Sequence, residues 1–532
     1  SRRQRQMCIR DRDDIEIKPK GTILVISPWN FPCAIPVGGI VAGLAGGNTV
    51  ILKPATVAAP VAWMFAKAFW DAGVPKEALQ VIITNREALK VLTTAPAIKH
   101  IILTGGTDTA QNIARANPVT PLSAETGGKN VIILTASGDR DHAIMNIVAS
   151  AFGNAGQKCS ACSLLLVERS VYEDKNFQSK LKDAATSLKV GSVWNPGNIV
   201  GPMITNKNDK LLQAFNLEPG ESWLVPPRFI DEKEYMLAPT VKWGVKPENF
   251  SFRTELFGPL LSVACIENLE EGIKLVNSLD YGLTSGLQSL DEEEQKLWKN
   301  SVIAGNLYIN RGITGAIVNR QPFGGMKLSA FGGGIKAGGP NYCTCFVEIT
   351  DKPDSQTDYI DSYFDACEEE FMDPRDVNKL YGEQNVFRYL PLKSMILRLF
   401  PEDTDREVNM ISYASELCRT PLTISFDPSD DRTAALTQYG WPLRKESLED
   451  FLKVMPDYER VRTCSPNIPK CMYERAAETN MYIVAAPPMK QGRIELIRYF
   501  KEQSISFEYH RYGSISEAVS YTHLRAHETL MN

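Results

Sequence analysis

The chain lacks the features that mark membrane-spanning and nucleic-acid-binding proteins. Its 532 residues contain no apolar run of about 18 residues, the length needed to cross a bilayer. Neither sign of charge predominates, because 58 basic residues stand against 63 acidic ones for a net charge of −5. The charge balance therefore gives no extended positive potential that would attract the phosphate backbone of a nucleic acid. We expect no membrane span and no nucleic-acid partner.

Histidine and paired cysteine motifs are scarce. The chain has five histidines, and its eleven cysteines are irregularly spread. Cys159 and Cys162 form a C-x-x-C pair, which is compatible with a redox disulfide or half a zinc site, but no second such pair or histidine pair accompanies it. We expect free thiols and no metal. Since no secretory signal precedes these cysteines, we also expect a cytoplasmic location.

The composition suits a large globular protein of about three domain-equivalents, with 43% hydrophobic residues. From Gly21 onward, short β-rich apolar runs alternate with helical patterns. This rhythm is typical of βαβ units on parallel sheets, so the predicted fold class is α/β. In the last helical pattern, Arg493 to Glu502, the residues Ile494, Ile497 and Phe500 recur at three-residue spacing, which predicts one apolar helix face.

The two ends of the chain look foreign to the fold. MCIRDR (Met7 to Arg12) and VSYTHL (Val519 to Leu524) can be encoded by opposite strands of one short DNA stretch, which resembles sequencing-adapter read-through. We therefore expect a fragment of a longer chain. The predicted division is an adapter-derived tail at 1–13, an N-terminally truncated nucleotide-binding domain at 14–125, a catalytic domain at 126–350, an acidic linker at 351–380, a C-terminal α/β lobe at 381–518 and a second tail at 519–532.

The densest chemical signal is AETGGKN (Ala124 to Asn130) followed by AGQKCSA (Ala155 to Ala161). A cysteine nucleophile needs a nearby carboxylate only if its covalent adduct is later hydrolysed by activated water. Upstream, Asn30 in SPWNFP could donate its amide to a developing oxyanion. A cysteine taken alone is more often a buried, inert thiol. The setting of Cys159 favours a nucleophile instead.

With TELFGP (Thr254 to Pro259) and QPFGG (Gln321 to Gly325), these motifs resemble the aldehyde dehydrogenase superfamily from Gly21 to about Thr350. The resemblance implies a parallel-sheet NAD-binding domain and an α/β catalytic domain, here followed by an additional α/β lobe. It also implies that Cys159 attacks the aldehyde. Asn30 and the Cys159 backbone N–H would stabilise the oxyanion, and Glu125 would activate the water that hydrolyses the thioester.

The resemblance also implies a nicotinamide cofactor. Lys53 would hydrogen-bond the adenosine ribose, Glu255 would hold the nicotinamide ribose, and Phe257 would pack near the ring. The pyrophosphate would face Gly105, Gly106 and Thr107, where a strand ends and a helix begins. Many relatives carry a glutamate where this chain has Thr56, so NAD is expected and NADP stays open.

The stretch from Tyr308 to Cys343 resembles the substrate-anchoring loop of L-glutamate γ-semialdehyde dehydrogenases, also called 1-pyrroline-5-carboxylate dehydrogenases. Ser160 and the backbone N–H groups of Gly315 and Ala316 would bind the substrate carboxylate. Phe31 and Phe323 would sandwich its methylenes. The implied reaction is NAD-dependent oxidation of this aldehyde to L-glutamate, the second step of proline catabolism.

Two C-terminal segments, Gly382 to Lys393 and Glu502 to Ser514, are similar to the proline utilization A family. In that family a proline dehydrogenase barrel with FAD precedes the aldehyde dehydrogenase part, and nothing in this chain resembles that barrel. We expect such a domain upstream in the full-length protein, FAD only in that absent part, and a homo-oligomer. The tail Glu508 to Ser514 is expected to dock on the dehydrogenase or a partner subunit.

Three alternatives remain open at this point. A different aldehyde dehydrogenase would share the mechanism but take another substrate. A coenzyme-A-acylating relative would resolve the thioester with a thiol, although Glu125 disfavours that chemistry. The truncated chain could also be catalytically silent and act only as a binding or oligomerisation module.

Overall fold

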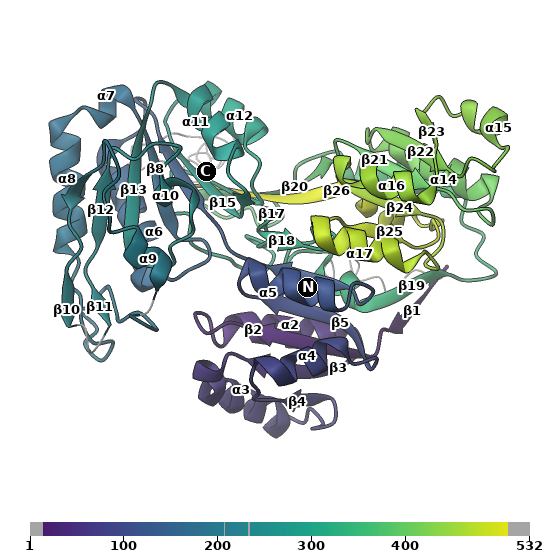
Figure 1. The fold of residues 1–532 in the computed structure, drawn as a ribbon, viewed down its shortest axis with the longest axis horizontal. Helices are drawn as coiled ribbons and strands as arrows, with labels where there is room; N and C mark the ends of the chain where they lie inside the picture. Colours follow the sequence, from purple (N-terminus) through teal and green to yellow (C-terminus); the bar gives the residue numbers. More distant parts are fainter. Residues whose placement is uncertain (1–13, 207, 232–234, 509–532) are drawn as a thin grey trace, which may run out of the picture. The chain divides into compact units, whose positions relative to one another are not determined.

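The structure, a computed structural model, describes residues 14–206, 208–231 and 235–508 (Figure 1). The chain divides into two compact units. Unit 1 combines Ser1–Thr126, Ala330–Pro374 and Arg388–Glu502, and unit 2 combines Gly127–Ser329, Arg375–Phe387 and Gln503–Asn532. Unit 1 therefore holds both the predicted nucleotide-binding segment and most of the C-terminal lobe. The predicted tails, 1–13 and 519–532, and Tyr509 to Ser514 of the predicted docking tail lie outside the described residues.

Unit 1 contains three sheets. Its strands are β1 (Ile15–Pro19), β2 (Thr22–Ser27), β3 (Thr49–Pro54), β4 (Leu79–Val81), β5 (Ile98–Thr104), β6 (Leu122–Glu125), β18 (Ala330–Phe331), β19 (Val347–Asp351), β21 (Met395–Arg398), β22 (Leu422–Phe426), β23 (Leu443–Lys445), β24 (Arg460–Thr463) and β25 (Ile483–Ala485). Its helices are α2 (Ala34–Ala45), η2 (Thr56–Ala58), α3 (Ala59–Asp71), α4 (Arg86–Thr94), α5 (Thr107–Ala116), η5 (Tyr342–Phe346), α13 (Tyr359–Ala366), η6 (Cys367–Phe371), α14 (Asp405–Leu417), α15 (Thr433–Thr437), α16 (Leu448–Val454), η7 (Met455–Asp457), α17 (Lys470–Thr479), α18 (Gly492–Glu495) and η8 (Leu496–Tyr499).

The N-terminal sheet of unit 1 has the order β18-β6-β5-β2-β3-β4, and every pair except β18–β6 is parallel. Side chains alternate between its faces, as the two-residue period of a strand requires. Ile23 and Val25 pack into one buried cluster, whereas Leu24 and Ile26 pack into another. Because both faces are covered, the strand reads as a continuous apolar run, which is typical of a parallel sheet between helices. The predicted α/β class is confirmed.

The C-terminal lobe is a second parallel sheet, with the order β23-β22-β21-β24-β25. Counted along the chain, this order is 3-2-1-4-5. The order β4-β3-β2-β5-β6 in the N-terminal sheet is the same, and it is the arrangement found in doubly wound nucleotide-binding folds. Two segments of unrelated sequence thus share one topology.

Unit 2 is built on one large sheet. Its strands are β7 (Asn130–Leu134), β8 (Cys162–Glu168), β9 (Ser222–Val225), β10 (Phe229–Asp231), β11 (Met236–Leu237), β12 (Thr240–Trp243), β13 (Leu260–Ile266), β14 (Tyr281–Gly282), β15 (Thr284–Gln288), β16 (Asn306–Ile309) and β17 (Met326–Lys327). Two further strands, β20 (Glu383–Pro391) and β26 (Phe500–Glu508), include residues assigned to each unit. The helices of unit 2 are α6 (Arg140–Phe152), η3 (Gly153–Gly156), α7 (Arg169–Tyr172), α8 (Lys175–Ser187), α9 (Asp209–Gln213), α10 (Phe250–Arg253), α11 (Leu269–Asn277) and α12 (Glu292–Ser301).

The large sheet has nine strands in the order β20-β26-β16-β15-β7-β8-β13-β12-β9. The strands from β16 to β12 are parallel to one another, and β9 is antiparallel to β12. Buried residues of β7 again alternate, with Ile132 and Leu134 in one cluster and Val131 and Ile133 in the other. The catalytic segment therefore starts from the central strands of a sheet buried on both faces.

Two expectations about the C-terminal part were wrong. The acidic stretch expected to be a partly ordered linker contains α13 and η6, and Tyr363, Cys367 and Phe371 within them are buried. Its apolar residues are spaced to bury one face, which the count of acidic residues concealed. The predicted helix from Arg493 to Glu502 ends at Tyr499, and Phe500 begins β26.

Helix termination at Tyr499 has a tertiary cause. Beyond this point the chain joins the large sheet, where Ser504 pairs with Asn306 and Phe507 with Ile309. Sheet pairing and burial override a short helical periodicity of three apolar residues. Phe500 is still buried, but as the first residue of a strand.

Candidate active site

In unit 1, the residues predicted to serve the cofactor and the oxyanion follow neighbouring strands of one parallel sheet. Ile26 near the end of β2 lies opposite Lys53 of β3 and Leu103 of β5, and Thr104 lies opposite Glu125 at the end of β6. Parallel strands present their carboxyl ends at one edge of the sheet, where α/β proteins bind ligands. Asn30, three residues after β2, is at the same edge.

The N-terminus of α5 fits a diphosphate. Its N-cap, Gly106, contributes no side-chain cap, and a Cβ placed there would meet nothing within 4 Å. The first helical residue is Thr107, and the backbone N–H of Gly105 donates to the Glu125 carbonyl at 3.1 Å. The open space and the positive end of the helix dipole suit an anion.

Lys53 supplies a cation at the same edge of the unit 1 sheet. The side chain is partly buried in β3, and burial lowers the pKa of its ammonium. An ammonium donates to hydroxyl oxygens such as those of a ribose. Lys53, together with the open start of α5, therefore fits the adenosine half of a dinucleotide.

A buried lysine to which the sequence motifs assign no role, Lys336, interacts electrostatically with Glu125. Lys336 is 1% exposed, and its backbone N–H donates to Glu502 Oε2 at 2.6 Å. Asn341 Nδ2 donates to Glu502 Oε1 at 2.6 Å. Burial lowers the pKa of Lys336 to about 8, although the carboxylates of Glu125 and Glu502 oppose this shift. Lys336 therefore lies within electrostatic reach of the predicted base.

In unit 2, Cys159 follows a tight turn with unusual backbone geometry. Asn154, Ala155 and Gly156 have φ values of 58°, 52° and 66°. Left-handed geometry costs free energy in residues other than glycine and persists only where the surroundings impose it. A Cβ on Gly156 would lie 2.3 Å from the carbonyl oxygen of Gly258, so only glycine fits there. The turn is thus locked against the TELFGP segment.

Asn130 holds the backbone around the nucleophile. Its Nδ2 donates to the carbonyls of Cys159 at 2.6 Å and Ala161 at 3.0 Å, and its Oδ1 accepts from the Thr284 N–H at 3.1 Å. Every hydrogen bond is to main chain, so the asparagine fixes the position of the peptide and leaves the thiol untouched. The AETGGKN motif includes this residue, but its spacing to Cys159 did not reveal the contact.

The two thiols of the C-x-x-C pair have different environments. Cys159 is partly exposed, whereas Cys162 is buried and its Sγ donates to the Leu164 carbonyl at 3.4 Å. Burial raises the pKa of Cys162 to about 12. Lys158 adjoins Cys159, and although burial lowers its pKa, the nearby Cys159 opposes that shift. A cation beside a thiol favours the thiolate, so Cys159 is the better nucleophile.

Glu255 rests on the glycines of the ETGGKN segment. Its Oε1 accepts a hydrogen bond from the Gly128 N–H at 2.8 Å. Phe257 has a φ of 50°, and Asn208 Nδ2 donates to the Leu256 carbonyl at 2.7 Å, which fixes the segment on α9. A carboxylate has acceptor capacity for several donors, including the hydroxyl groups of a ribose. Glu255 thus fits the nicotinamide half of a dinucleotide.

The predicted anchoring loop is attached to the core of unit 2 through a buried tyrosine. The Tyr308 hydroxyl donates to the Gly315 carbonyl at 2.8 Å, and Cys159 lies within electrostatic reach of that phenol. Ser160 is buried, whereas Ala316 is exposed. In the sequence Tyr308 is the first residue of the loop motif, and no spacing rule indicates that it connects the loop to the neighbourhood of the nucleophile.

Phe323 in unit 2 is half-buried beside Pro322, whose carbonyl accepts from Asn306 Nδ2 at 2.9 Å and from the Ser504 hydroxyl at 2.7 Å. Phe31 belongs to unit 1 and is also half-buried. Their predicted sandwich of the substrate therefore joins residues of both units and stays a prediction.

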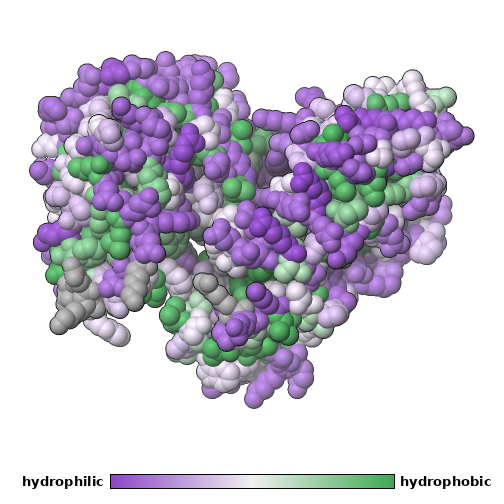
Figure 2. Space-filling model, viewed as in Figure 1, coloured by the Kyte–Doolittle hydropathy of each residue, from purple (hydrophilic) through white to green (hydrophobic). Residues whose placement is uncertain are grey.

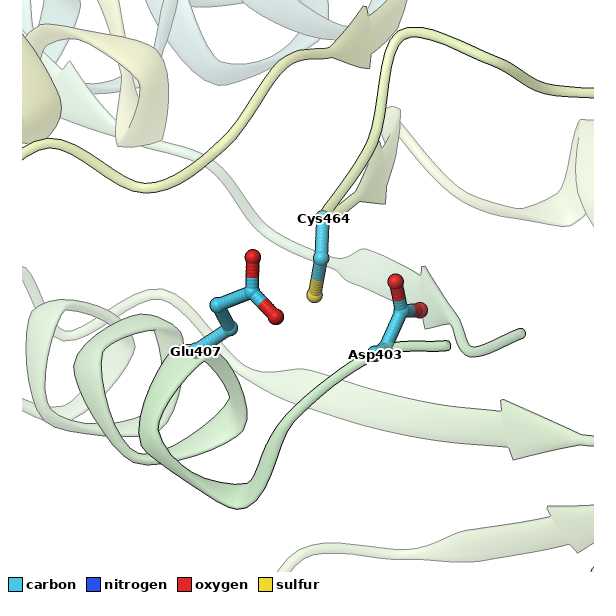
Figure 3. Close-up of side chains that lie close together, drawn as sticks. All are labelled: Asp403, Glu407 and Cys464. Atoms are coloured by element: carbon cyan, nitrogen blue, oxygen red, sulfur yellow. The ribbon is translucent and has the colours of Figure 1, made fainter. Parts of the chain in front are cut away.

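Figure 3 shows a cluster in the C-terminal lobe formed by Asp403, Glu407 and Cys464, whose side chains point toward one another. Their ligand atoms lie within 4.8 Å of one another. Glu407 is already used in a capping box, where it accepts from the Thr404 N–H at 2.8 Å, and Asp403 accepts from the Phe400 N–H at 2.8 Å. Burial raises the pKa of Asp403 to about 6 and that of Cys464 well above its usual range. Both carboxylates are thus engaged by backbone N–H groups, and burial favours the neutral Cys464 thiol, which ligates metals poorly, so we assign no metal to this cluster.

None of the helices formed by residues 14–206, 208–231 and 235–508 meets the length and apolarity that a membrane crossing requires. None of the ten cysteines within the same ranges forms a disulfide.

Comparison with known proteins places this geometry in a family. Residues 8–351 match the model of the aldehyde dehydrogenase family. The chain belongs to the aldehyde dehydrogenase family. The 1-pyrroline-5-carboxylate dehydrogenase of Geobacillus kaustophilus is 37% identical over 335 residues, which cover 61% of this chain and 64% of that enzyme. The chain thus spans less than two thirds of the length of this curated relative.

Solved structures extend the likeness beyond the family match. Proline utilization A from Corynebacterium freiburgense is 34% identical with a TM-score of 0.83, and the match covers 97% of this chain and 52% of that protein. A 1-pyrroline-5-carboxylate dehydrogenase from Thermus with bound NAD is 34% identical with a TM-score of 0.59, covering 64% of this chain and 68% of that enzyme. The C-terminal lobe is therefore part of the likeness to the first protein.

Proposed function

We propose that the protein to which this chain belongs oxidises L-glutamate γ-semialdehyde to L-glutamate with NAD, as the second step of proline catabolism. The observation that carries the proposal is Cys159, a partly exposed thiol beside Lys158 that is held by Asn130 on a locked turn. The names of the relatives supply the substrate class, since they are called 1-pyrroline-5-carboxylate dehydrogenases.

The first chemical step is addition of the Cys159 thiolate to the aldehyde carbon. A C–S bond forms and the carbonyl electron pair moves to oxygen, where the Asn30 amide and the Cys159 N–H would stabilise it. When bound, the nicotinamide would accept the hydride from this thiohemiacetal, which leaves a thioester on Cys159. Lys53, the start of α5 and Glu255 are the groups that would hold the cofactor.

Hydrolysis of the thioester returns the enzyme to its starting state. Glu125 would take a proton from water, the hydroxide would add to the thioester carbon, and the C–S bond would break as glutamate leaves. Ser160 and the N–H groups of Gly315 and Ala316 would bind the substrate α-carboxylate, with Phe31 and Phe323 on its methylenes. Because Thr56 replaces a common glutamate, the same site could also admit NADP.

The similarity to proline utilization A also suggests which domains and subunits accompany this chain. The match to the Corynebacterium protein covers 52% of that chain, which supports a proline dehydrogenase domain, with its FAD, elsewhere in the full-length protein. We also propose that the protein forms a homo-oligomer, as the resemblance implies.

The decisive experiment compares two cysteines of the same motif. Cys159→Ala should abolish NADH formation from glutamate semialdehyde, because no other thiol is positioned to form the adduct. Cys162→Ala is the matched control and should retain most activity, since Cys162 is buried and inert. Substantial NADH formation by Cys159→Ala would contradict the covalent mechanism.

A further inference from the structure

The segment Gly127–Asn130 lies between the nucleophile and the cofactor-holding carboxylate. On one side, Gly128 donates its N–H to Glu255 Oε1 at 2.8 Å. On the other, Asn130 donates to the Cys159 carbonyl at 2.6 Å. Four consecutive residues therefore contact both Glu255 and the backbone of Cys159, and two of them, Gly127 and Lys129, have no part in the proposed chemistry.

The backbone conformation of Gly127 does not require glycine at this position. Neither it nor Gly128 has a left-handed φ, so their backbone geometry is open to any residue. A Cβ on Gly127 would instead lie 2.3 Å from Glu255 Oε2 and 2.8 Å from its carboxylate carbon. Gly127 thus leaves the space that the Glu255 carboxylate occupies.

Lys129 places a buried amino group in the core of unit 2, within electrostatic reach of this carboxylate. Its side chain is 3% exposed, and its Nζ donates to the Ser163 carbonyl at 3.2 Å. Burial lowers the pKa of Lys129 to about 7, and the nearby Cys162 and Glu255 oppose the shift. A buried ammonium is costly unless another group compensates it, and a packed apolar side chain of the same size is often as stable or more so.

We propose that Gly127 and Lys129 are positioning residues for Glu255, which keep its carboxylate placed and ionised so that it can bind the nicotinamide ribose. This inference rests on the proposed function, since it assumes the dinucleotide. An ionised carboxylate accepts hydrogen bonds from both ribose hydroxyls, whereas the protonated form has lost acceptor capacity.

The electrostatics of Glu255 agree with this role. Burial raises the pKa of Glu255, and the Gly128 N–H, Lys210 and Lys129 all oppose that rise. Lys210 is exposed, so solvent and salt screen its contribution, whereas Lys129 is buried and little screened. Lys129 is therefore the cation whose loss should change the charge state of Glu255.

The first test measures NAD+ binding to the full chain by isothermal titration calorimetry. Lys129→Met should weaken binding by roughly tenfold or more, the range expected when hydrogen bonds to a charged group are lost. Lys210→Met, which removes the exposed lysine near the same carboxylate, should change the affinity by about twofold or less, and salt should abolish that small change. Thermal unfolding without NAD+ should show Lys129→Met to be at least as stable as the wild type.

The second test uses a matched pair of glycines. Gly127→Ala should fold, because the group its methyl meets is the end of a flexible side chain, but it should displace Glu255 and weaken NAD+ binding by about tenfold. Gly38→Ala is the control, since a Cβ there meets nothing within 4 Å, and its affinity should match the wild type.

The outcomes separate this inference from the proposed function. If wild type binds NAD+ and both Lys129→Met and Gly127→Ala bind it equally well, the positioning role is overturned and the cofactor assignment stands. If Lys129→Met does not fold, Gly127→Ala decides alone. A wild-type chain that binds no NAD+ would overturn the cofactor assignment and the positioning role with it.

Discussion

At the scale of single residues, Cys159 and Cys162 show how neighbours determine reactivity. The two thiols are three positions apart, yet Cys162 is buried at the start of a central strand, whereas Cys159 is partly exposed beside Lys158. Desolvation favours the neutral thiol, and a nearby cation favours the thiolate. The C-x-x-C spacing therefore does not indicate a redox pair in this fold.

Glu125→Gln should separate the two chemical steps. The amide cannot take a proton from water, but Cys159 can still add to the aldehyde. We expect a stoichiometric burst of NADH followed by turnover reduced by at least about a hundredfold, which stopped-flow absorbance would measure. Unchanged steady-state turnover would mean that another group activates the water, and Lys336 would then be the first residue to examine.

Ser160→Ala tests substrate recognition. The hydroxyl is predicted to donate to the substrate carboxylate, and such a hydrogen bond contributes about 1.5–3 kcal/mol. We expect kcat/KM for glutamate semialdehyde to fall about tenfold to a hundredfold, with little change for an uncharged aldehyde of similar length. Equal losses for both aldehydes would indicate that Ser160 supports Cys159 instead.

At the scale of elements, the C-terminal lobe is held together by a buried ion pair. Arg462 on β24 contacts Glu495 on α18 at 3.0 Å, and both side chains are fully buried. Glu495 also accepts from the Tyr499 hydroxyl at 3.1 Å and the Met489 N–H at 3.0 Å. One carboxylate therefore connects the strand to the short helix that precedes β26.

Removing this carboxylate should destabilise the lobe strongly. In Glu495→Gln, Arg462 stays buried without its counter-charge, and breaking such a pair costs about 3–5 kcal/mol. Urea unfolding followed by far-UV circular dichroism should show a clearly lower midpoint. The exposed pair Lys453–Glu449 offers the control, because Lys453→Gln should change stability by less than about 1 kcal/mol. A midpoint shift no larger than that of Lys453→Gln would contradict a stabilising role for the pair.

For one helix of the C-terminal lobe, the spacing of apolar residues is sufficient to predict the bounds. The sequence pattern from Leu448 to Val454 predicts a helix, and α16 has these bounds, with Ser447 capping it by accepting from the Asp450 N–H. The helix predicted from Arg493 to Glu502 is wrong at its end, because three apolar residues at helical spacing also fit a short helix followed by a strand. In such a short run, pairing with a neighbouring strand decides whether the chain continues as a helix or becomes a strand.

At the scale of the whole molecule, apolar residues are exposed on one helix of unit 1. Val57 in η2 and Val61, Trp63 and Met64 in the first half of α3 are exposed, and Figure 2 shows green surface residues in the region where Figure 1 draws α3. Contiguous exposed apolar residues often mark contact surfaces. This agrees with the proposal of a homo-oligomer.

The molar mass of the protein in solution tests the prediction of a homo-oligomer. Size-exclusion chromatography with light scattering should give a multiple of 59.1 kDa for the full chain. Dilution should shift the mass toward the single-chain value if the contact is weak, because association depends on concentration. A mass of 59.1 kDa at all concentrations, including those used in the assay, would contradict the homo-oligomer.

The sequence alone determined the α/β class, the family and the identity of the candidate site residues, because those depend on local periodicity and on short motifs whose chemistry requires particular side chains. The tertiary structure decided what lies around them. Asn130 beneath Cys159, Lys129 beside Glu255 and Lys336 near Glu125 are brought together by strand register and burial. The shared strand order of the two parallel sheets in unit 1 was also invisible in the sequence, since many different apolar runs can satisfy one sheet topology.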